Sequence, residues 1–270
     1  MKVAGAAFAL LFAPTLASAA DLPNPYPDVA RSYYVLVNGQ PLWGKAIDEP
    51  LPPASLTKVM TAVIAARRLD LDQAVTVSAA ATRVDGTRMG LHAGDRVTGR
   101  DLLRAALVRS ANDACVALAE AVSGTEAAFV AAMNREAATA GLTHTHFVNA
   151  CGLDAPGHLS TVRDLVALGQ ELMKDPVLAG IVGQTQAAIR VNGKARRLQS
   201  TNALMGAFPG TRGIKTGHTE RAGKCLLVLV ERGDTKVLAA FLDARDRWWD
   251  AVAVLELAFR HRNETPAAAR

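Results

Sequence analysis

The spacing of the hydrophobic residues changes along this chain, and that change constrains the fold more than any other feature of the sequence. Near the beginning, two apolar stretches flank the turn signal Asn38-Gly39 and predict a β-hairpin made of Tyr33–Val37 and Gln40–Lys45. Over residues 55–176, apolar residues recur at helical spacing instead. After residue 210 the spacing changes again, to alternating or continuous apolar runs that are typical of strands.

These patterns predict which elements form and how they meet. In the middle of the chain we expect helices at about 55–69, Arg100–Val108, Asn112–Val122, Thr125–Ala140 and Ser160–Met173. Near the end we expect three strands and a last helix, at Gly213–Thr216, Lys224–Glu231, Lys236–Leu242 and Trp248–Arg260. Strands at both ends with helices between them imply a mixed α/β (α+β) fold, in which N- and C-terminal strands pair into one antiparallel sheet. Helices would cover this sheet, and a helical lobe would be inserted between its two halves.

The first twenty residues have the shape of a secretory signal. One early charge, Lys2, is followed by the apolar run Val3–Phe12 and by the small residues Ala17-Ser18-Ala19. The apolar run is too short to span a bilayer, which needs about 20 residues. We therefore expect a signal peptide at 1–20, one main domain at 21–262 and a short tail at 263–270. The mature protein should be exported to the periplasm or cell envelope, soluble, and without an evident membrane anchor.

The charges and cysteines argue against several classes of protein. The net charge of +5 comes from Lys and Arg that are scattered without a basic run, so we expect no nucleic-acid partner. The sequence contains no H-E-x-x-H or C-x-x-C motif, so neither a metal nor another cofactor is expected. Three cysteines allow at most one internal disulfide. We expect Cys115 and Cys225 to be buried, and Cys151, in a loop-like stretch, to be easier to reach.

A serine and a lysine three residues apart, Ser55 and Lys58, stand at the expected start of the first helix. Side chains at this spacing share a helix face, roughly 5–6 Å apart at Cβ, so Ser55 Oγ and Lys58 Nζ can meet. A serine becomes a good nucleophile when a neighbouring base takes its proton, and an uncharged lysine can be that base. Burial and the positive end of the helix dipole both favour the uncharged amine. Alone, however, this spacing is common by chance, and an ordinary helix start, with a cap-like Ser near an exposed Lys, accounts for it better.

Two further motifs follow in order, and each occurs once: Ser110-Ala111-Asn112 and Lys215-Thr216-Gly217. Taken singly, the first could be a helix cap and the second a strand that ends in a turn. As a set, S-x-x-K, S-x-N and K-T-G are the motifs of penicillin-interacting serine enzymes. With the stretches around them, they make about residues 30–262 resemble the low-molecular-mass penicillin-binding proteins, the serine D-alanyl-D-alanine carboxypeptidases. The stretches that carry the resemblance are Glu49–Lys58, Ser110–Ala114, Thr145–Asn149, Gly157–Thr161 and Gly213–Thr219.

The resemblance implies the fold of serine β-lactamases, a penicillin-binding domain over 21–262, and a cleft between the lobes in which peptide bonds are cut. Ser55 would attack the penultimate D-Ala of a peptidoglycan stem peptide, and Lys58 would take its proton. The N–H groups of Ser55 and His218 would form the oxyanion hole. Ser110 would hydrogen-bond Lys58 and pass a proton to the leaving amine, and Asn112 would hold a substrate amide.

The third motif would bind the carboxylate end of the substrate. Lys215 and Thr216, at the end of an edge strand, offer a cation and a hydroxyl to the terminal carboxylate. Gly217 would leave room for the substrate backbone beside the strand. Related enzymes often carry a second carboxylate-binding arginine where Arg247 falls. Arg245 is two residues away, so the choice between the two stays open.

The resemblance also implies covalent inhibition by β-lactams, and it leaves alternatives for the reaction. The first expectation is a carboxypeptidase that removes the terminal D-Ala. A D,D-endopeptidase that cuts cross-links is the alternative, because a short chain is also seen among those enzymes. A class A β-lactamase is less expected, since no E-x-x-L-N-like stretch lies between Ser110 and Lys215.

Overall fold

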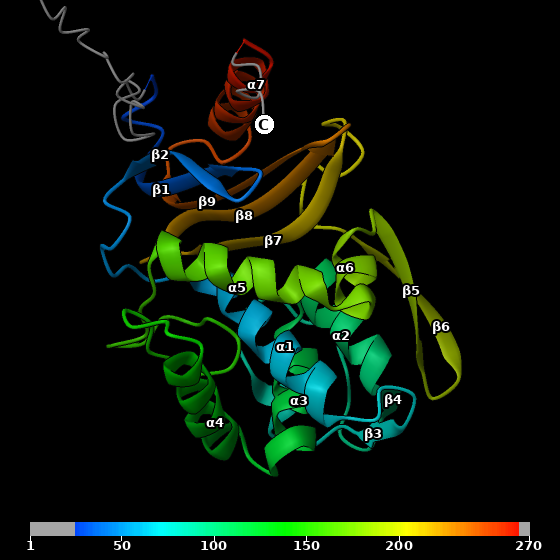
Figure 1. Ribbon diagram of the computed structural model, residues 1–270. Coiled ribbons are helices and arrows are strands. Elements are labelled where there is room, and N and C mark those ends of the chain that lie inside the picture. The colour runs from blue at the N-terminus through cyan, green and yellow to red at the C-terminus, as the bar shows by residue number, and fades with distance from the viewer. Residues whose placement is uncertain (1–24, 265–270) are drawn as a thin grey trace, which may run out of the picture.

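The computed structural model describes residues 25–264, which form a five-stranded antiparallel sheet with helices on both faces (Figure 1). The strand order is β2-β1-β9-β8-β7, so strands from the beginning of the chain lie beside strands from its end. Their bounds are Ala30–Val37 (β1), Gln40–Lys45 (β2), Thr211–Thr219 (β7), Gly223–Arg232 (β8) and Thr235–Ala244 (β9). The predicted fold class is confirmed. The predicted signal peptide and residues 265–270 of the predicted tail lie outside the described residues.

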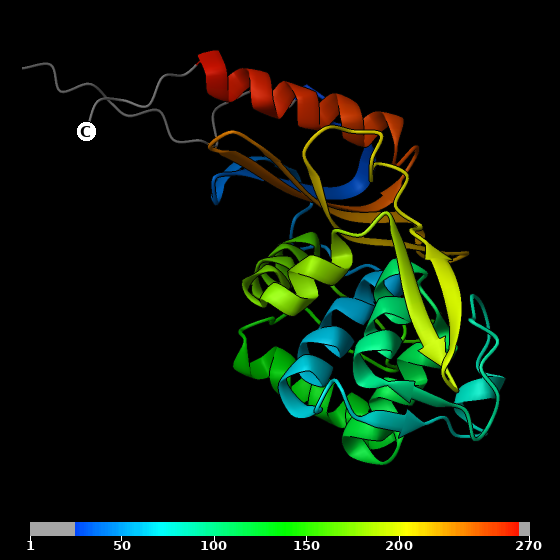
Figure 2. The same cartoon turned by 90° about the vertical axis from the view of Figure 1, so that its right-hand side faces the viewer.

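Both faces of the sheet are buried, which explains why its central strands read as continuous apolar runs. In β8, Leu226 and Val228 belong to the hydrophobic cluster that includes α7 (Trp249–Glu264). Leu227 and Leu229 belong to the cluster on the other face, shared with the helical lobe. Figure 2 shows α7 along one face and the lobe on the other. A strand with one wet face would alternate apolar and polar residues instead.

The helical lobe is built around α1, whose Val59, Met60 and Ile64 are fully buried. Within the described residues its helices are Lys58–Arg68 (α1), Gly99–Val108 (α2), Asn112–Ser123 (α3), Glu126–Thr139 (α4), Val162–Lys174 (α5) and Pro176–Val182 (α6). Side chains that accept a hydrogen bond from a first-turn N–H cap four of them: Thr98 (α2), Thr125 (α4), Thr161 (α5) and Asp175 (α6). The predicted helices are therefore present, with ends shifted by a few residues.

Two small hairpins of the lobe were not predicted from the sequence. One pairs β3 (Ala74–Thr76) with β4 (Arg96–Thr98), and the other pairs β5 (Gln186–Val191) with β6 (Lys194–Gln199). The turn of the second is Asn192-Gly193, in which both residues have positive φ. An Asn-Gly pair is a strong hairpin signal, so this element was readable from the sequence.

The expectation for Cys151 was wrong. Its side chain is only 1 % exposed, as buried as those of Cys115 and Cys225, and all three cysteines are free thiols. The loop that carries Cys151 packs against the turn that carries Ser55, because Gly152 lies directly over the backbone of Ala54.

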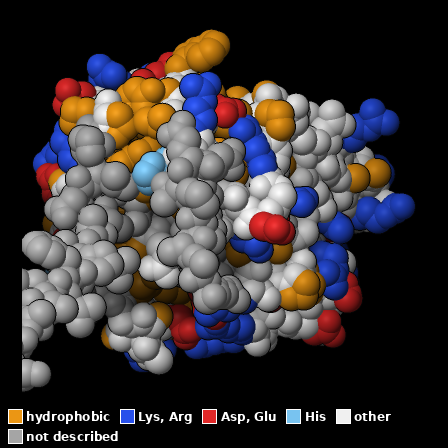
Figure 3. All heavy atoms as spheres, turned by 45° about the horizontal axis from the view of Figure 1, so that its top comes forward, with side chains coloured by type: hydrophobic (Ala, Val, Ile, Leu, Met, Phe, Trp, Pro, Cys, Tyr) orange, Lys and Arg blue, Asp and Glu red, His pale blue; other side chains and the backbone are white. Residues whose placement is uncertain are grey.

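No single described helix is long and apolar enough to cross a bilayer. The consecutive helices α3 and α4 meet the requirement only when taken together, and they bend by 81° at their junction. On the side of the molecule that carries α7, basic and acidic side chains are scattered among apolar and polar ones (Figure 3).

Candidate active site

Ser55 lies on one turn of 3-10 helix, η2 (Ala54–Thr57), that runs directly into α1. The predicted helix therefore begins in a tighter form than expected, as helix ends often do. Ala54, just before the serine, has a φ of +48°. Non-glycine residues seldom adopt such an angle, and those that do are concentrated at functional sites. The turn packs against β7 and β8, which places Ser55 at the sheet edge.

Lys58 contacts the serine as predicted. Its Nζ donates hydrogen bonds to Ser55 Oγ at 2.8 Å and to the backbone O of Cys151 at 2.7 Å. The lysine is almost completely buried, with 1 % of its surface exposed. Two acceptors hold Nζ beside Ser55 Oγ, so a proton can pass between Ser55 and Lys58 without a change of rotamer.

Asn149 organises the turn that presents the Cys151 carbonyl to Lys58. Its Oδ1 accepts hydrogen bonds from the backbone N–H groups of residues 151, 152 and 153, at 3.2, 2.7 and 3.0 Å. Gly152 has a φ of +85°, and a Cβ there would lie 1.9 Å from Ala54 O. Glycine is therefore required where this turn meets the backbone next to the nucleophile.

His158 connects the same loop to η2 through hydrogen bonds of both ring nitrogens. Its Nδ1 accepts hydrogen bonds from the N–H groups of Val148 and Asn149, at 3.0 and 3.4 Å. Burial, followed by the neighbouring charge of His146, lowers the pKa of His158 to about 4. The ring is then neutral at pH 7, so Nε2 carries the proton and donates to Thr57 Oγ1 at 2.8 Å. Thr57 lies between the two residues of the Ser55–Lys58 pair, so His158 helps to fix the spacing of that pair.

The second and third motifs meet through Lys215. Its Nζ donates hydrogen bonds to Ser110 Oγ at 2.8 Å and to the backbone O of Thr216 at 2.9 Å. The predicted hydrogen bond between Ser110 and Lys58 is not formed among the described residues, because β7 brings Lys215 to Ser110 Oγ, while Lys58 donates to Ser55 and Cys151. Since Ser110 accepts from Lys215, its own hydroxyl hydrogen is free to serve another acceptor.

Asn112 lies at the start of α3, beneath the loop of residues 84–91. Its Nδ2 donates to Asp85 O at 2.5 Å, and its backbone N–H donates to Thr87 O at 2.7 Å. The Asp113 carboxylate accepts from the N–H groups of Met89 and Leu91 and fastens the loop further. The amide group of Asn112 is thus engaged by the loop, and its contact with a substrate stays a prediction.

Thr216 and Gly217 of the third motif make different contacts near Ser55. Thr216 Oγ1 lies 2.8 Å from Thr201 Oγ1, a partner that the sequence analysis did not identify. A Cβ on Gly217 would lie 2.9 Å from Ala54 Cβ and 3.0 Å from Ser55 N. Glycine therefore allows β7 to approach the nucleophile, in addition to the predicted room for substrate. His218 follows on β7 with an exposed side chain.

The two candidate arginines face different ways. Arg247 Nη1 donates to Gly217 O at 2.5 Å, and its guanidinium stacks on Trp248 at 4.8 Å from the ring centroid. Arg245 is mostly exposed and lies 3.7 Å from Asp250. Of the two, Arg247 is the one that reaches the third motif.

Lys58, Lys215 and Arg247 bring three basic side chains close together. In the part of the chain that the structure describes, none of them forms an ion pair. Burial, and then the charges of Lys58 and Arg247, hold the pKa of Lys215 well below its ordinary value. Burial also lowers the pKa of Arg247. A ligand that carries a negative charge could therefore provide the counter-charge that these three side chains lack.

Comparison with known proteins agrees with this arrangement. A profile of the family Peptidase_S11, described as D-alanyl-D-alanine carboxypeptidase, matches residues 22–246. The chain belongs to the D-alanyl-D-alanine carboxypeptidase family. The resemblance inferred from the motifs is confirmed.

Curated members of the carboxypeptidase family are similar over most of this chain. It is 37% identical to DacC of Escherichia coli, over 90% of this chain and 63% of that protein. It is 33% identical to DacF of Bacillus subtilis, over 84% of this chain and 61% of that protein. The chain thus spans about three fifths of the length of these two relatives. The crystal structure of a D-alanyl-D-alanine carboxypeptidase of Mycobacterium tuberculosis superimposes with a TM-score of 0.83 at 32% identity, covering 92% of this chain and 96% of that one.

Three residues of the site in this carboxypeptidase-family chain were missed as functional candidates: Asn149, His158 and Thr201. The first two fall in stretches that carry the family resemblance, so their positions were marked but their roles were not. Thr201 had no signal, because only the fold brings it to Thr216.

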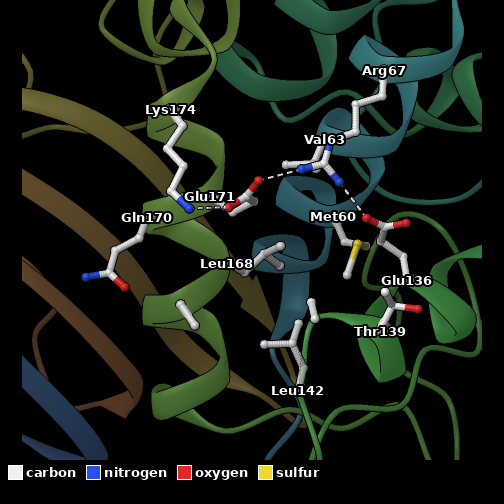
Figure 4. Close-up of a pocket in the computed structure, with 12 residues that line it drawn as sticks. Met60, Val63, Arg67, Glu136, Thr139, Leu142, Leu168, Gln170, Glu171 and Lys174 are labelled. Carbon is white, nitrogen blue, oxygen red and sulfur yellow. Dashed lines mark hydrogen bonds and ion pairs between the residues drawn. The ribbon is translucent and has the colours of Figure 1, made fainter.

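A cavity of about 650 Å³ lies outside this site, between α1, α4 and α5 (Figure 4). Its wall includes the apolar Met60 and Leu168, and Arg67 bridges Glu136 and Glu171 at its rim. None of the motif residues lines this cavity, and the ion pairs already neutralise its charged groups.

Proposed function

We propose that the protein is a serine D,D-peptidase that removes the terminal D-alanine from peptidoglycan stem peptides. The observation that carries this proposal is the cluster of Lys58, Lys215 and Arg247, which has no carboxylate partner among the described residues. A stem peptide ends in a carboxylate one residue beyond the bond to be cut. Binding that carboxylate supplies the missing charge and brings the penultimate carbonyl towards Ser55.

Acylation follows from the contacts of the two serines. Ser55 Oγ forms a bond to the carbonyl carbon of the penultimate D-Ala, and its proton passes to Lys58 Nζ, which lies 2.8 Å away and acts as the base. The bond to the terminal D-Ala nitrogen then breaks. Ser110 donates its hydroxyl proton to that nitrogen and takes a proton in return from Lys215 Nζ, which donates to it at 2.8 Å. Water hydrolyses the ester on Ser55 and releases the shortened peptide.

The same contacts support covalent inhibition by penicillins. A penicillin carries a carboxylate beside a reactive amide bond, so it offers the cation cluster and Ser55 the same two groups as the peptide. The opened β-lactam stays attached to Ser55 as an ester. The substrate lies in the cell wall, and we place the protein in the periplasm or cell envelope, as the signal-like residues 1–20 predict.

The test is mass analysis of products from two defined muropeptides, an uncross-linked pentapeptide and a D,D-cross-linked dimer. We expect the pentapeptide to lose one D-Ala, and Ser55→Ala to leave it intact. Cleavage of the dimer alone would show that the protein acts as an endopeptidase and not as a carboxypeptidase. Rapid hydrolysis of penicillin with both muropeptides intact would indicate a β-lactamase, and turnover by Ser55→Ala would refute the acyl-enzyme.

A further inference from the structure

Two buried thiols, Cys115 and Cys151, lie behind the catalytic serine and lysine. Cys115 is on the first turn of α3, and Cys151 is on the turn held by Asn149. Each thiol reaches across to the other's segment: Cys115 Sγ contacts Ala150 O at 3.2 Å, and Cys151 Sγ contacts Asn112 O at 3.6 Å. Burial raises the pKa of the Cys151 thiol, and the nearby Cys115 thiol adds to this shift. They are therefore neighbours, although 36 positions separate them in the sequence numbering.

The pair touches the catalytic groups through the backbone. The carbonyl of Cys151 is the second acceptor of Lys58 Nζ, at 2.7 Å. Cys115 lies three residues after Asn112, the last residue of the second motif. The third cysteine, Cys225, lies on β8, and its thiol contacts Ala222 O at 3.5 Å.

We infer that Cys115 and Cys151 are a redox-sensitive pair that closes to a disulfide with a disulfide oxidant and thereby slows acylation of Ser55. The effect on acylation rests on the proposed function, whereas formation of the bond does not. In the reaction, both S–H bonds break, one S–S bond forms, and two electrons and two protons pass to the oxidant. The oxidant, a small-molecule disulfide such as oxidised glutathione, is reduced to two thiols.

Closure must alter the contact with Lys58. A disulfide requires the sulfurs to approach to about 2.05 Å, much closer than two thiols that are not bonded can lie. Helix α3 is packed on several sides, so Cys151, which is in a loop, is the partner that moves. The carbonyl of Cys151 moves with it, and the hydrogen bond that fixes Lys58 beside Ser55 weakens. A misplacement of about 1 Å at a catalytic group can cost on the order of 100-fold in rate. We expect acylation to slow by at least about 10-fold.

The experiment incubates the reduced, purified protein with excess oxidised glutathione and samples it over time. Each sample is unfolded, treated with a maleimide and weighed by intact mass spectrometry. We expect the maleimide count to fall from three to one, with Cys225 as the labelled residue, and peptide mapping to show Cys115 joined to Cys151. Three free thiols at the end of the time course, or separate glutathione adducts on single cysteines, would overturn the pair. Because the bond is measured by mass, this result does not depend on activity.

The second measurement is the rate of fluorescent penicillin labelling before oxidation, after it, and after reduction with dithiothreitol. We expect labelling to slow and then recover in the parent protein and in Cys225→Ala, which keeps the pair. In Cys115→Ala, which cannot form the bond, the oxidant should leave the labelling rate where it was. A disulfide that forms without changing the labelling rate of the parent would overturn the regulatory effect. An unlabelled protein in both redox states would refute the proposed function instead.

Discussion

Ser110 Oγ lies 2.8 Å from Lys215 Nζ, so the serine of the second motif is joined to the third motif rather than to the first. Lys58 is left with Ser55 and the Cys151 carbonyl as its partners. The two lysines therefore have different serine partners. Lys58 stands beside Ser55, the proposed nucleophile, and Lys215 holds Ser110, the proposed proton donor to the leaving amine.

Replacing Ser55 by alanine should abolish covalent labelling by fluorescent penicillin. The substitution removes the atom that forms the ester, and it leaves the packing of η2 almost unchanged because alanine fits the same space. Labelling is read on a denaturing gel, and a thermal melt close to that of the parent serves as the control for folding. A labelled Ser55→Ala protein would show that another residue is the nucleophile.

Lys58→Arg should lose acylation almost as completely as Lys58→Ala. Arginine keeps the positive charge but is not deprotonated in proteins, so it cannot take the serine proton. The measurement is the second-order rate constant of penicillin labelling, with Lys194→Arg on exposed β6 as a matched control. Near-normal acylation by Lys58→Arg would mean that Lys58 provides charge alone.

Arg247→Gln should raise KM for a carboxylate-terminated peptide by roughly 10-fold to 100-fold, the value of a hydrogen bond to a charged group. Arg245→Gln is the matched control and should resemble the parent, since Arg245 faces Asp250. A peptide with an amidated C-terminus has no carboxylate to bind, so Arg247→Gln should affect it much less. Equal losses on both peptides would indicate that Arg247 only supports the end of β7.

Thr201→Val should lower kcat/KM by roughly 5-fold, which corresponds to about 1 kcal/mol for one net hydrogen bond. When Thr201 donates to Thr216 at 2.8 Å, the Thr216 hydroxyl is left to donate to the substrate carboxylate. Valine keeps the shape of threonine but not its hydroxyl. Thr201→Ser should recover most of the activity, and failure of this rescue would point to packing rather than the hydroxyl.

His158 should make folding stability depend on pH between about 4 and 6.5. Its pKa is lowered by burial to about 4 in the folded protein, from 6.5. The unfolded chain therefore binds the proton more tightly, and stability falls as pH falls through this window. The full effect is on the order of 3 kcal/mol. Urea unfolding at several pH values measures it. The dependence should shrink in His158→Gln and persist in His144→Gln, a change of an exposed histidine.

Much of the sheet could be predicted because an apolar run is a local signal of a strand. The catalytic motifs could be predicted because their residue types and spacing point to a specific reaction. Leu226–Leu229 read as a buried strand, and S-x-x-K places Ser55 and Lys58 on neighbouring positions in almost any helical geometry. The hydrogen-bond partners could not be read in this way. Whether Ser110 binds Lys58 or Lys215 depends on how deeply β7 enters the cleft, which is set by the close approach of Gly217 to Ala54.

The burial of Cys151 and the contact between Thr201 and Thr216 are also long-range effects. The residues around Cys151 read as an exposed loop in the sequence. In the structure, hydrogen bonds of Asn149 and His158 hold this loop against η2. Thr201 follows an ordinary strand, and nothing near it in the sequence indicates its partner. The β5–β6 hairpin is a different case, since its Asn192-Gly193 turn was a readable local signal.

The pairing of β1 with β9 limits how early in folding the proposed site can assemble. Val35 and Ala239 are neighbours in the sheet although about 200 residues separate them along the chain. Contacts at such separation form slowly, because a long loop must be closed before they give any stability. During synthesis, Ser55 and Lys58 emerge long before β7, which brings Lys215 and is added at the edge beside β8. The segment that carries Ser55 is therefore made first and the segment that carries Lys215 late, so the two halves of the proposed site come together only after β7 has joined the sheet.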